Sequence, residues 1–218
     1  MFQIMKKLSF FAVLFAVPSA LFLLSSCGKN ALNNLSNEES RIYITNRDST
    51  ANFKSYKTFS IVDSVAVIQN NQMAGMELTS GDAQLLQLIT AQMAQRGYVL
   101  VNKDQNPDLG INVTYIANTY TNVVQYPYDW WNTPGYFDPG YWGYGGYGYY
   151  FPPTFGIYQT NENYMTVDLI DLKNASQDQK LNAVWNATLK GEQVLNPGNY
   201  PSEVKAIFDQ SPYLQSGK

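Results

Sequence analysis

Apolar and polar residues alternate in three stretches of the chain, 109–115, 165–170 and 181–190. A period of two puts successive side chains on opposite faces of a strand, so each stretch predicts a β-strand with one buried and one wet face. The last two stretches predict a hairpin, which favours an antiparallel sheet. Further strands are predicted over 41–46, 56–68 and 98–101, because these segments are rich in β-branched and aromatic residues.

Two segments have the residue spacing of amphipathic helices. In the first, Ser80-Gly81-Asp82 offers N-cap candidates and Gly97 marks the end, and the apolar residues between them share one face: Leu85, Leu86, Ile89 and Met93. In the second, Ser202 is the expected N-cap, and one face carries Val204, Ile207 and Phe208. Helices on one face of an antiparallel sheet define an α+β domain, in which Trp185 should face the core.

Residues 126–158 form an aromatic insert with 9 Tyr, 3 Trp and 3 Phe among 33 residues, together with 7 Gly and 5 Pro. Gly and Pro disfavour regular structure, so we expect a long Tyr/Gly/Trp-rich loop outside the core, on which little of the fold depends. Tyr and Trp combine a large flat ring with a polar tip, which suits contact with sugars or with an apolar protein surface. Contact with lipid headgroups and a loop without a specific role are the alternatives. The candidate contact residues are Trp130, Trp131, Tyr136, Tyr141, Trp142, Tyr144, Tyr147 and Tyr149.

Charge and composition exclude several classes of function. The chain has 14 Lys+Arg against 17 Asp+Glu, and no Lys or Arg occurs between Lys103 and Lys173. Nucleic-acid binding needs basic residues along the phosphates, so we expect no nucleic-acid partner. The chain has no His and a single Cys, which excludes His-based catalysis, His-ligated metals and disulfide scaffolds. We therefore expect no metal and no cofactor.

The first 26 residues have the pattern of a bacterial secretory signal. Lys6 and Lys7 precede an almost wholly apolar run over 8–24. The sequence Leu24-Ser25-Ser26-Cys27 follows and resembles the lipobox, in which the Cys thiol receives a diacylglyceryl group. The bond before the Cys, here Ser26–Cys27, is then cleaved. An uncleaved anchor with an incidental Cys is the alternative.

Lipidation of Cys27 would fix the location of the mature chain. Additional acyl chains, such as palmitate, anchor a protein stably because each buried methylene contributes about 0.8 kcal/mol. Gly28, in place of an acidic residue, favours the outer membrane, and a periplasm-facing orientation is expected. The Asn- and Ser-rich stretch over 28–40 is typical of a polar tether.

Asp168 and Asp171 are the candidates for a catalytic carboxylate pair, with Glu162 close by in sequence. Because they are three residues apart, they should point to opposite faces of a regular strand. We expect Asp168 on the wet face and Asp171 at the turn that ends the strand. A hydrolase acting on glycan or peptide is therefore the alternative to a binding protein.

Several short segments follow one another in a recognisable order: Phe53–Phe59, Arg96–Tyr98, Asn106–Leu109, Val167–Asp171, Val184-Trp185, Ile207-Phe208 and Ser211-Pro212. Together they extend over about 41–212. In this order they resemble the bacterial lipoprotein family called domain of unknown function 4136. The resemblance implies an α+β lipoprotein of the cell envelope, and it implies no activity.

The sequence thus predicts a signal peptide over 1–26, a lipidated tether over 27–40 and one α+β domain over 41–218, with the insert at 126–158. The expected function is that of a non-enzymatic, outer-membrane-anchored binding or accessory module of the envelope. Besides the membrane itself, an envelope protein or a cell-wall glycan is the expected partner.

We predict that the mature protein begins at an acylated Cys27. Mass spectrometry of membrane-extracted protein should find lipid on the N-terminal Cys27, whereas Cys27→Ala should accumulate as the full-length precursor because it lacks the thiol that is modified. Recovery of a mature, soluble and unlipidated protein from wild-type cells would contradict the assignment.

Overall fold

The computed structural model describes residues 40–69, 72–117, 139–152, 163–191 and 193–217. Contacts divide the chain into two units, 1–36 and 37–218, and all described residues belong to the second. The predicted signal peptide and nearly all of the predicted tether lie outside the described residues. Within the described part, no helix is both long and apolar enough to cross a membrane.

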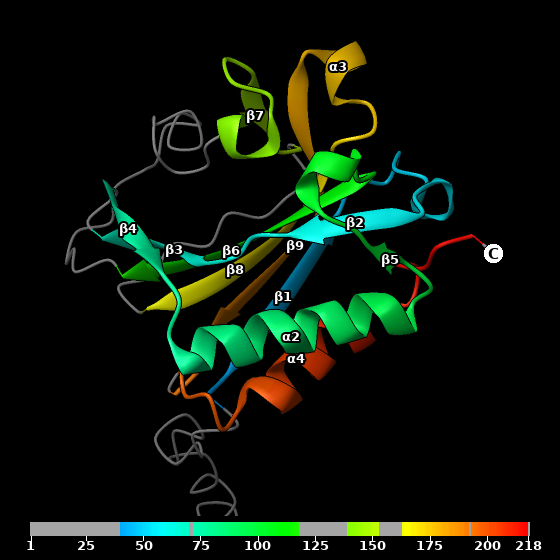
Figure 1. Ribbon diagram of the computed structural model, residues 1–218. Coiled ribbons are helices and arrows are strands. Elements are labelled where there is room, and N and C mark those ends of the chain that lie inside the picture. The colour runs from blue at the N-terminus through cyan, green and yellow to red at the C-terminus, as the bar shows by residue number, and fades with distance from the viewer. Residues whose placement is uncertain (1–39, 70–71, 118–138, 153–162, 192, 218) are drawn as a thin grey trace, which may run out of the picture. The chain divides into compact units, whose positions relative to one another are not determined.

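One nine-stranded sheet forms the framework of the described domain (Figure 1). Its three long strands are β6 (Leu109–Ala117), β8 (Tyr164–Asp171) and β9 (Lys180–Lys190), which pair antiparallel in the order β6-β8-β9. β1 (Ile42–Arg47) continues the sheet antiparallel to β9. The shorter strands are β2 (Thr58–Ile61), β3 (Val65–Gln69), β4 (Gln72–Glu77), β5 (Val99–Leu100) and β7 (Gly148–Tyr150).

The prediction of a purely antiparallel sheet is wrong, because the sheet is mixed. β2 and β3 both pair parallel with β6, β5 pairs parallel with β2, and β7 pairs parallel with β9. The single strand expected over 56–68 is divided into β2 and β3. Both pair with the same long strand β6, β2 along its first part and β3 along its last part. The helix α2 (Ser80–Gln95) then returns the chain so that β5 and β6 run in the direction of β2, as crossover connections do.

Helices α2 and α4 (Tyr200–Asp209) lie side by side on one face of the sheet, as the sequence predicted (Figure 1). Their caps differ from the prediction. α2 is capped by Thr79, whose hydroxyl accepts from the Asp82 amide while the Asp82 carboxylate accepts from the Thr79 amide. α4 begins after Asn199 and not after Ser202, with Pro201 in its first turn. A third, short helix, α3 (Ala175–Asp178), leads into β9.

The apolar core lies between these two helices and the sheet. The predicted inward residues of α2 are buried, namely Leu85, Leu86, Ile89 and Met93. Trp185 on β9 is 0% exposed, its ring centroid lies 5.6 Å from that of Phe208, and its indole nitrogen donates to the Ser211 hydroxyl at 2.8 Å. The predicted core position of Trp185 is confirmed.

Truncation of Trp185 should destabilise the domain without a specific effect on binding. Trp185→Ala should lower the free energy of unfolding by about 3–5 kcal/mol, since it leaves a cavity under α4. Trp185→Phe retains a ring against Phe208 but loses the hydrogen bond to Ser211, and it should cost less. Chemical denaturation followed by circular dichroism measures both; a Trp185→Ala variant of wild-type stability would contradict the core assignment.

Candidate functional site

Two edge strands approach each other end to end along β9. β1 ends with Arg47 opposite Trp185, and β7 ends with Tyr150 opposite Asn182. Between these points β9 carries a bulge, because Leu169 of β8 pairs with Trp185 whereas the next residue, Ile170, pairs with Ala183. The carbonyl oxygen of the bulged Val184 accepts a hydrogen bond from the Asp48 amide nitrogen, at 2.9 Å. Both strands therefore leave the sheet at the bulge and open a gap in its edge.

A cavity of about 650 Å³ occupies this place, and we call it the β1–β7 pocket. Its volume lies within the range of about 300–1,000 Å³ that is usual for small-ligand sites. Four segments line it: the chain after β1, the end of β7, the end of β8 with α3, and the start of β9. The lining residues are Asp48, Ser49, Thr50, Ala51, Asn52, Ser55, Tyr56, Tyr150, Pro152, Asp171, Asn174, Asp178, Lys180, Asn182 and Val184.

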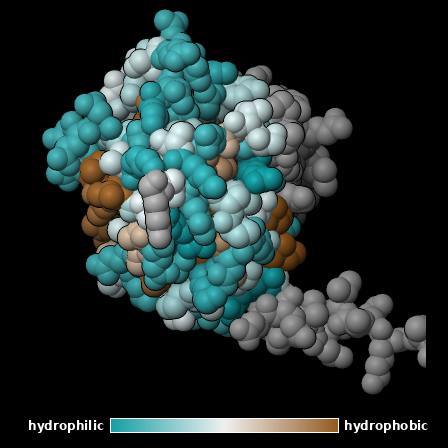
Figure 2. Space-filling view, turned by 90° about the vertical axis from the view of Figure 1, so that its right-hand side faces the viewer, coloured by the Kyte–Doolittle hydropathy of each residue, from teal (hydrophilic) through white to brown (hydrophobic). Residues whose placement is uncertain are grey.

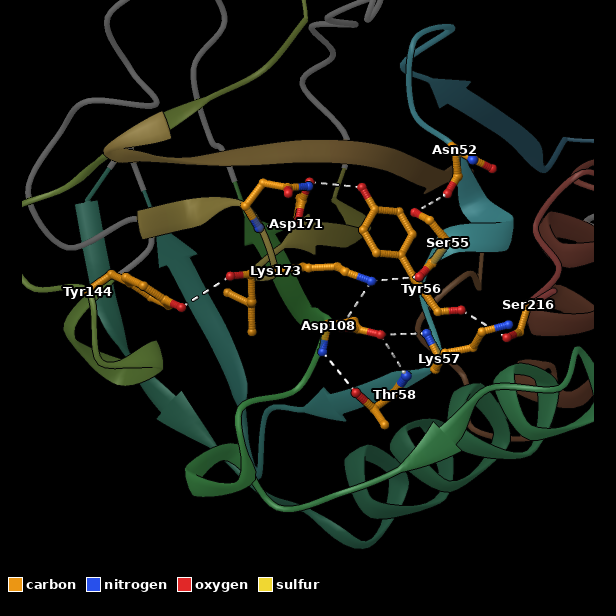
Figure 3. Close-up of polar contacts among 12 residues, drawn as sticks. Asn52, Ser55, Tyr56, Lys57, Thr58, Asp108, Tyr144, Asp171, Lys173 and Ser216 are labelled. Carbon is orange, nitrogen blue, oxygen red and sulfur yellow. Dashed lines mark hydrogen bonds and ion pairs between the residues drawn. The ribbon is translucent and has the colours of Figure 1, made fainter. Parts of the chain in front are cut away.

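One wall of the pocket is fixed by hydrogen bonds to Asp171 (Figure 3). The Tyr56 hydroxyl donates to Asp171 Oδ2 at 2.8 Å, and Asn174 donates to the same carboxylate through its amide and its side chain, at 3.0 and 2.6 Å. Burial and the nearby Asp171 charge raise the pKa of Tyr56 well above its ordinary value, so this phenol stays a proton donor. The prediction that Asp171 opens the turn after β8 is confirmed, and its contacts give it a structural role.

The remaining polar side chains leave acceptor atoms open to a ligand. Asp48 uses Oδ1 to accept from the Thr50 amide and hydroxyl, and Asp178 uses Oδ2 to accept from Asn182. Among the described residues, the second oxygen of each carboxylate has no hydrogen-bond partner. Tyr150 is 41% exposed, and the Lys180 ammonium lies 4.1 Å from the centre of its ring. The pocket thus combines an exposed ring with three carboxylates and one ammonium.

The described residues contain no group of three or more His, Cys, Asp or Glu side chains arranged to hold a metal ion. The pocket is a polar site with one aromatic edge. In ligand sites, rings cover apolar faces of the bound molecule and a few polar groups fix its orientation.

Asp168 lies on the opposite sheet face from the helices and is 0% exposed, so its predicted place on a wet face is wrong. It belongs to a row across four strands, in which Asn112, Asp168, Asn186 and Asn46 are successive register partners. The Asn186 amide donates to Asp168 Oδ1 at 2.5 Å and the Asn46 amide donates to Asn186 Oδ1 at 3.3 Å. We call these four residues the polar row.

Part of the aromatic insert covers the polar row. The Trp142 indole donates to Asn112 Oδ1 at 3.1 Å, and the Asn112 amide donates to the Tyr149 hydroxyl at 2.6 Å. Trp142 and Tyr149 are only 7% and 8% exposed and belong to the main apolar cluster. A side chain at Gly110 would lie 3.0 Å from the Trp142 ring, so glycine permits this close approach. The expectation that the core does not depend on the insert is therefore wrong for these two rings.

The other candidate rings have different positions. Tyr141, Tyr144 and Tyr147 are half-buried; the Tyr141 hydroxyl accepts the Asp63 amide, and the Tyr144 hydroxyl donates to the Leu172 carbonyl (Figure 3). Trp130, Trp131 and Tyr136 lie outside the described residues, as does Glu162. Tyr150, which the sequence did not single out, is the exposed ring that lines the pocket.

Burial of the polar row has an electrostatic consequence. Desolvation raises the pKa of Asp168 from 3.8 to about 7, although the hydrogen bonds from Asn186 and Thr166 act to lower it. Burial also raises the pKa of Glu203, to about 7, and the neighbouring Arg41 opposes that shift. Both acids therefore bind protons in the folded state at pH values where they would be ionised in the unfolded chain.

The mixed sheet, the helix pair on one face and the polar pocket at a sheet edge define the described part as an α+β domain with a cavity of ligand size at its edge. The family model described as "Domain of unknown function (DUF4136)" matches residues 44–213. The chain belongs to this family.

A solved structure of a DUF4136 family protein from Bacteroides thetaiotaomicron is similar, with 33% sequence identity and a TM-score of 0.66. The match covers 82% of this chain and 99% of that one. A PelC dodecamer from Paraburkholderia phytofirmans matches at 13% identity and a TM-score of 0.40, over 82% of this chain and 99% of that one. No curated protein matches the sequence.

We predict that Asp168→Asn changes the pH dependence of stability. A folded-state pKa above the unfolded value favours the native state below about pH 4, and this contribution is lost as pH rises toward 7. Asp168→Asn should thus be more stable than wild type at pH 8, by up to about 4 kcal/mol at 1.36 kcal/mol per pKa unit, and should lose this advantage at pH 4.

Denaturant unfolding at several pH values measures the effect. The free energy of unfolding of Asp168→Asn should still depend on pH to some extent, because Glu203 titrates in the same range. Asp104→Asn, at an exposed position, is the matched control and should leave the slope of wild type unchanged. An Asp168→Asn protein that is less stable than wild type at pH 8 would show that the ionised carboxylate is favourable in the fold.

Proposed function

We propose that this protein is a non-enzymatic lipoprotein, anchored to the outer membrane through Cys27 and facing the periplasm, that binds a component of the cell envelope. The β1–β7 pocket carries this proposal. It is a cavity of about 650 Å³ with open polar groups and one exposed ring, built on the ends of strands. Strand ends are rigid supports, which favours a preformed binding site.

The state of the acidic residues favours binding over catalysis. Asp171 is occupied by three hydrogen bonds from the chain itself. Asp168 is fully buried within the polar row and has no access to a substrate. A glycosidase general acid needs a carboxyl sheltered from water beside the scissile bond, whereas the pocket acid Asp178 is exposed. These observations favour a binding module over the hydrolase alternative.

The surface chemistry favours a polar ligand. Hydrophilic residues cover most of the face shown in Figure 2, and apolar residues form only small, separate patches there. Stable protein interfaces usually present a larger apolar centre. On this face, a broad apolar docking surface is therefore not favoured.

The lipid anchor would place the pocket within reach of envelope components. The predicted tether over 27–40 has 14 residues, which span at most about 50 Å when fully extended. Trp130, Trp131 and Tyr136 keep their place as candidate contact residues, since they lie outside the described part. The aromatic rings Trp142 and Tyr149 are assigned to the core instead.

Obstruction of the pocket should abolish envelope binding. Ser49 lines the pocket and is exposed, so Ser49→Trp places a large ring at its entrance. Gln87→Trp, on the exposed side of α2, is the matched control. Immobilised lipid-anchored protein should retain equal amounts of envelope glycan or envelope protein in its wild-type and Gln87→Trp forms. The Ser49→Trp form should retain at least tenfold less.

Two outcomes would contradict the proposal. Undiminished binding by Ser49→Trp would remove the pocket from recognition. Release of soluble fragments from cell-wall material by wild-type protein, abolished in Asp171→Asn, would establish the hydrolase alternative. Melting temperatures of both tryptophan variants should equal that of wild type, which separates obstruction from unfolding.

A further inference from the structure

We infer that the ligand of the β1–β7 pocket is a neutral saccharide that stacks on Tyr150 and donates its hydroxyl groups to the pocket's acceptor oxygens. This inference rests on the proposed binding function and specifies its ligand class. It follows from three properties of the pocket: an exposed ring with one face already covered, carboxylate oxygens without a hydrogen-bond partner among the described residues, and an excess of negative charge.

The first property is the state of the Tyr150 ring. Lys180 lies 4.1 Å from the ring centre and covers one face, while 41% of the residue remains exposed at the pocket edge. Tyr150 does not belong to the main apolar cluster of the described residues, so its ring is not part of the core there. A sugar ring has a flat apolar face of C–H groups, which suits the remaining face of a tyrosine.

The second property is the balance of hydrogen-bonding atoms. Asn182 and Asn174 each donate one side-chain amide hydrogen, to Asp178 and Asp171 respectively, and their carbonyl oxygens are available as acceptors. The second oxygens of Asp48 and Asp178 add two more acceptors among the described residues. Sugar hydroxyl groups both donate and accept, so they can pair with these oxygens and with the amide hydrogens that remain.

The third property is charge. Asp48, Asp171 and Asp178 face one ammonium, that of Lys180, among the lining residues. Like charges within one pocket cost free energy that increases as water is excluded. The site should therefore reject uronate or phosphorylated sugars of the same length as a neutral oligosaccharide that it binds.

Defined trisaccharides test the inference by isothermal titration calorimetry. Cellotriose, maltotriose and tri-N-acetylchitotriose are the neutral probes, and trigalacturonate is the acidic probe of equal length. Wild-type protein should bind at least one neutral probe and bind trigalacturonate at least tenfold more weakly. Tyr150→Ala should weaken neutral binding about tenfold, whereas Tyr150→Phe, which keeps the ring, should stay within threefold of wild type.

An isosteric change isolates the charge effect. Asn at position 178 can still accept from Asn182, so Asp178→Asn removes the charge while retaining the bond. The open oxygen becomes an amide nitrogen, which affects both probes alike, so the expected result is that the preference for the neutral probe over trigalacturonate falls about threefold.

The controls separate this inference from the proposed function. If Ser49→Trp abolishes envelope binding but no neutral trisaccharide binds the wild-type protein, the saccharide inference is overturned. The proposal of a binding module then still holds. The same holds if only a protein fraction of the envelope binds in a pocket-dependent manner. Equal or tighter binding of trigalacturonate would overturn the charge argument, and binding that is unaffected by Tyr150→Ala would overturn stacking.

Discussion

Strand β8 is buried along all eight of its residues, and this double burial is the constraint on which the rest of the domain depends. An antiparallel strand pair can leave one face wet, but here both faces must be covered. Helices α2 and α4 cover the first face with apolar side chains around Trp185. The second face carries the polar row, whose side chains satisfy one another and receive Trp142 and Tyr149 as a cover. Buried polar groups are tolerated because they find such partners.

The same constraint produces the pocket. β9 must pair with β8 on one edge, so β1 and β7 share the other edge and meet end to end at the Val184 bulge. Neither strand can continue past the other, and their chains turn away from the sheet. The cavity lies between the two points at which the chain leaves the sheet, after β1 and after β7. Its position follows from strand pairing, and its chemistry follows from the residues that happen to flank each strand end.

The sequence was sufficient for elements whose evidence is local. Alternation predicted the long strands, and the placement of Trp185 and of the α2 apolar face was confirmed because each follows from neighbouring residues. Asp168 was assigned to the wrong environment because its burial depends on Asn186, 18 residues away, and on rings of the insert. One signal was available: the central polar positions of these strands carry short Asn, Thr and Asp side chains, and Lys occurs only at the ends of β9, whereas a solvated face usually carries Lys or Glu along its length. Tyr150 was missed because its role requires a parallel pairing with β9 that no local pattern reveals.

The fold shows where the lysines that follow the long stretch without Lys or Arg lie. The first two cations after the long stretch without Lys or Arg are Lys173 and Lys180, and both lie beside the pocket wall. Lys173 donates to the Ser55 carbonyl at 2.7 Å and lies 3.7 Å from an Asp108 oxygen, so its charge is used to hold the chain after β1 against the end of β8 (Figure 3). Lys180 is held over Tyr150. Because both ammonium groups are engaged by the wall itself, neither forms an ion pair with Asp48 or Asp178 among the described residues, and the cavity keeps an excess of negative charge.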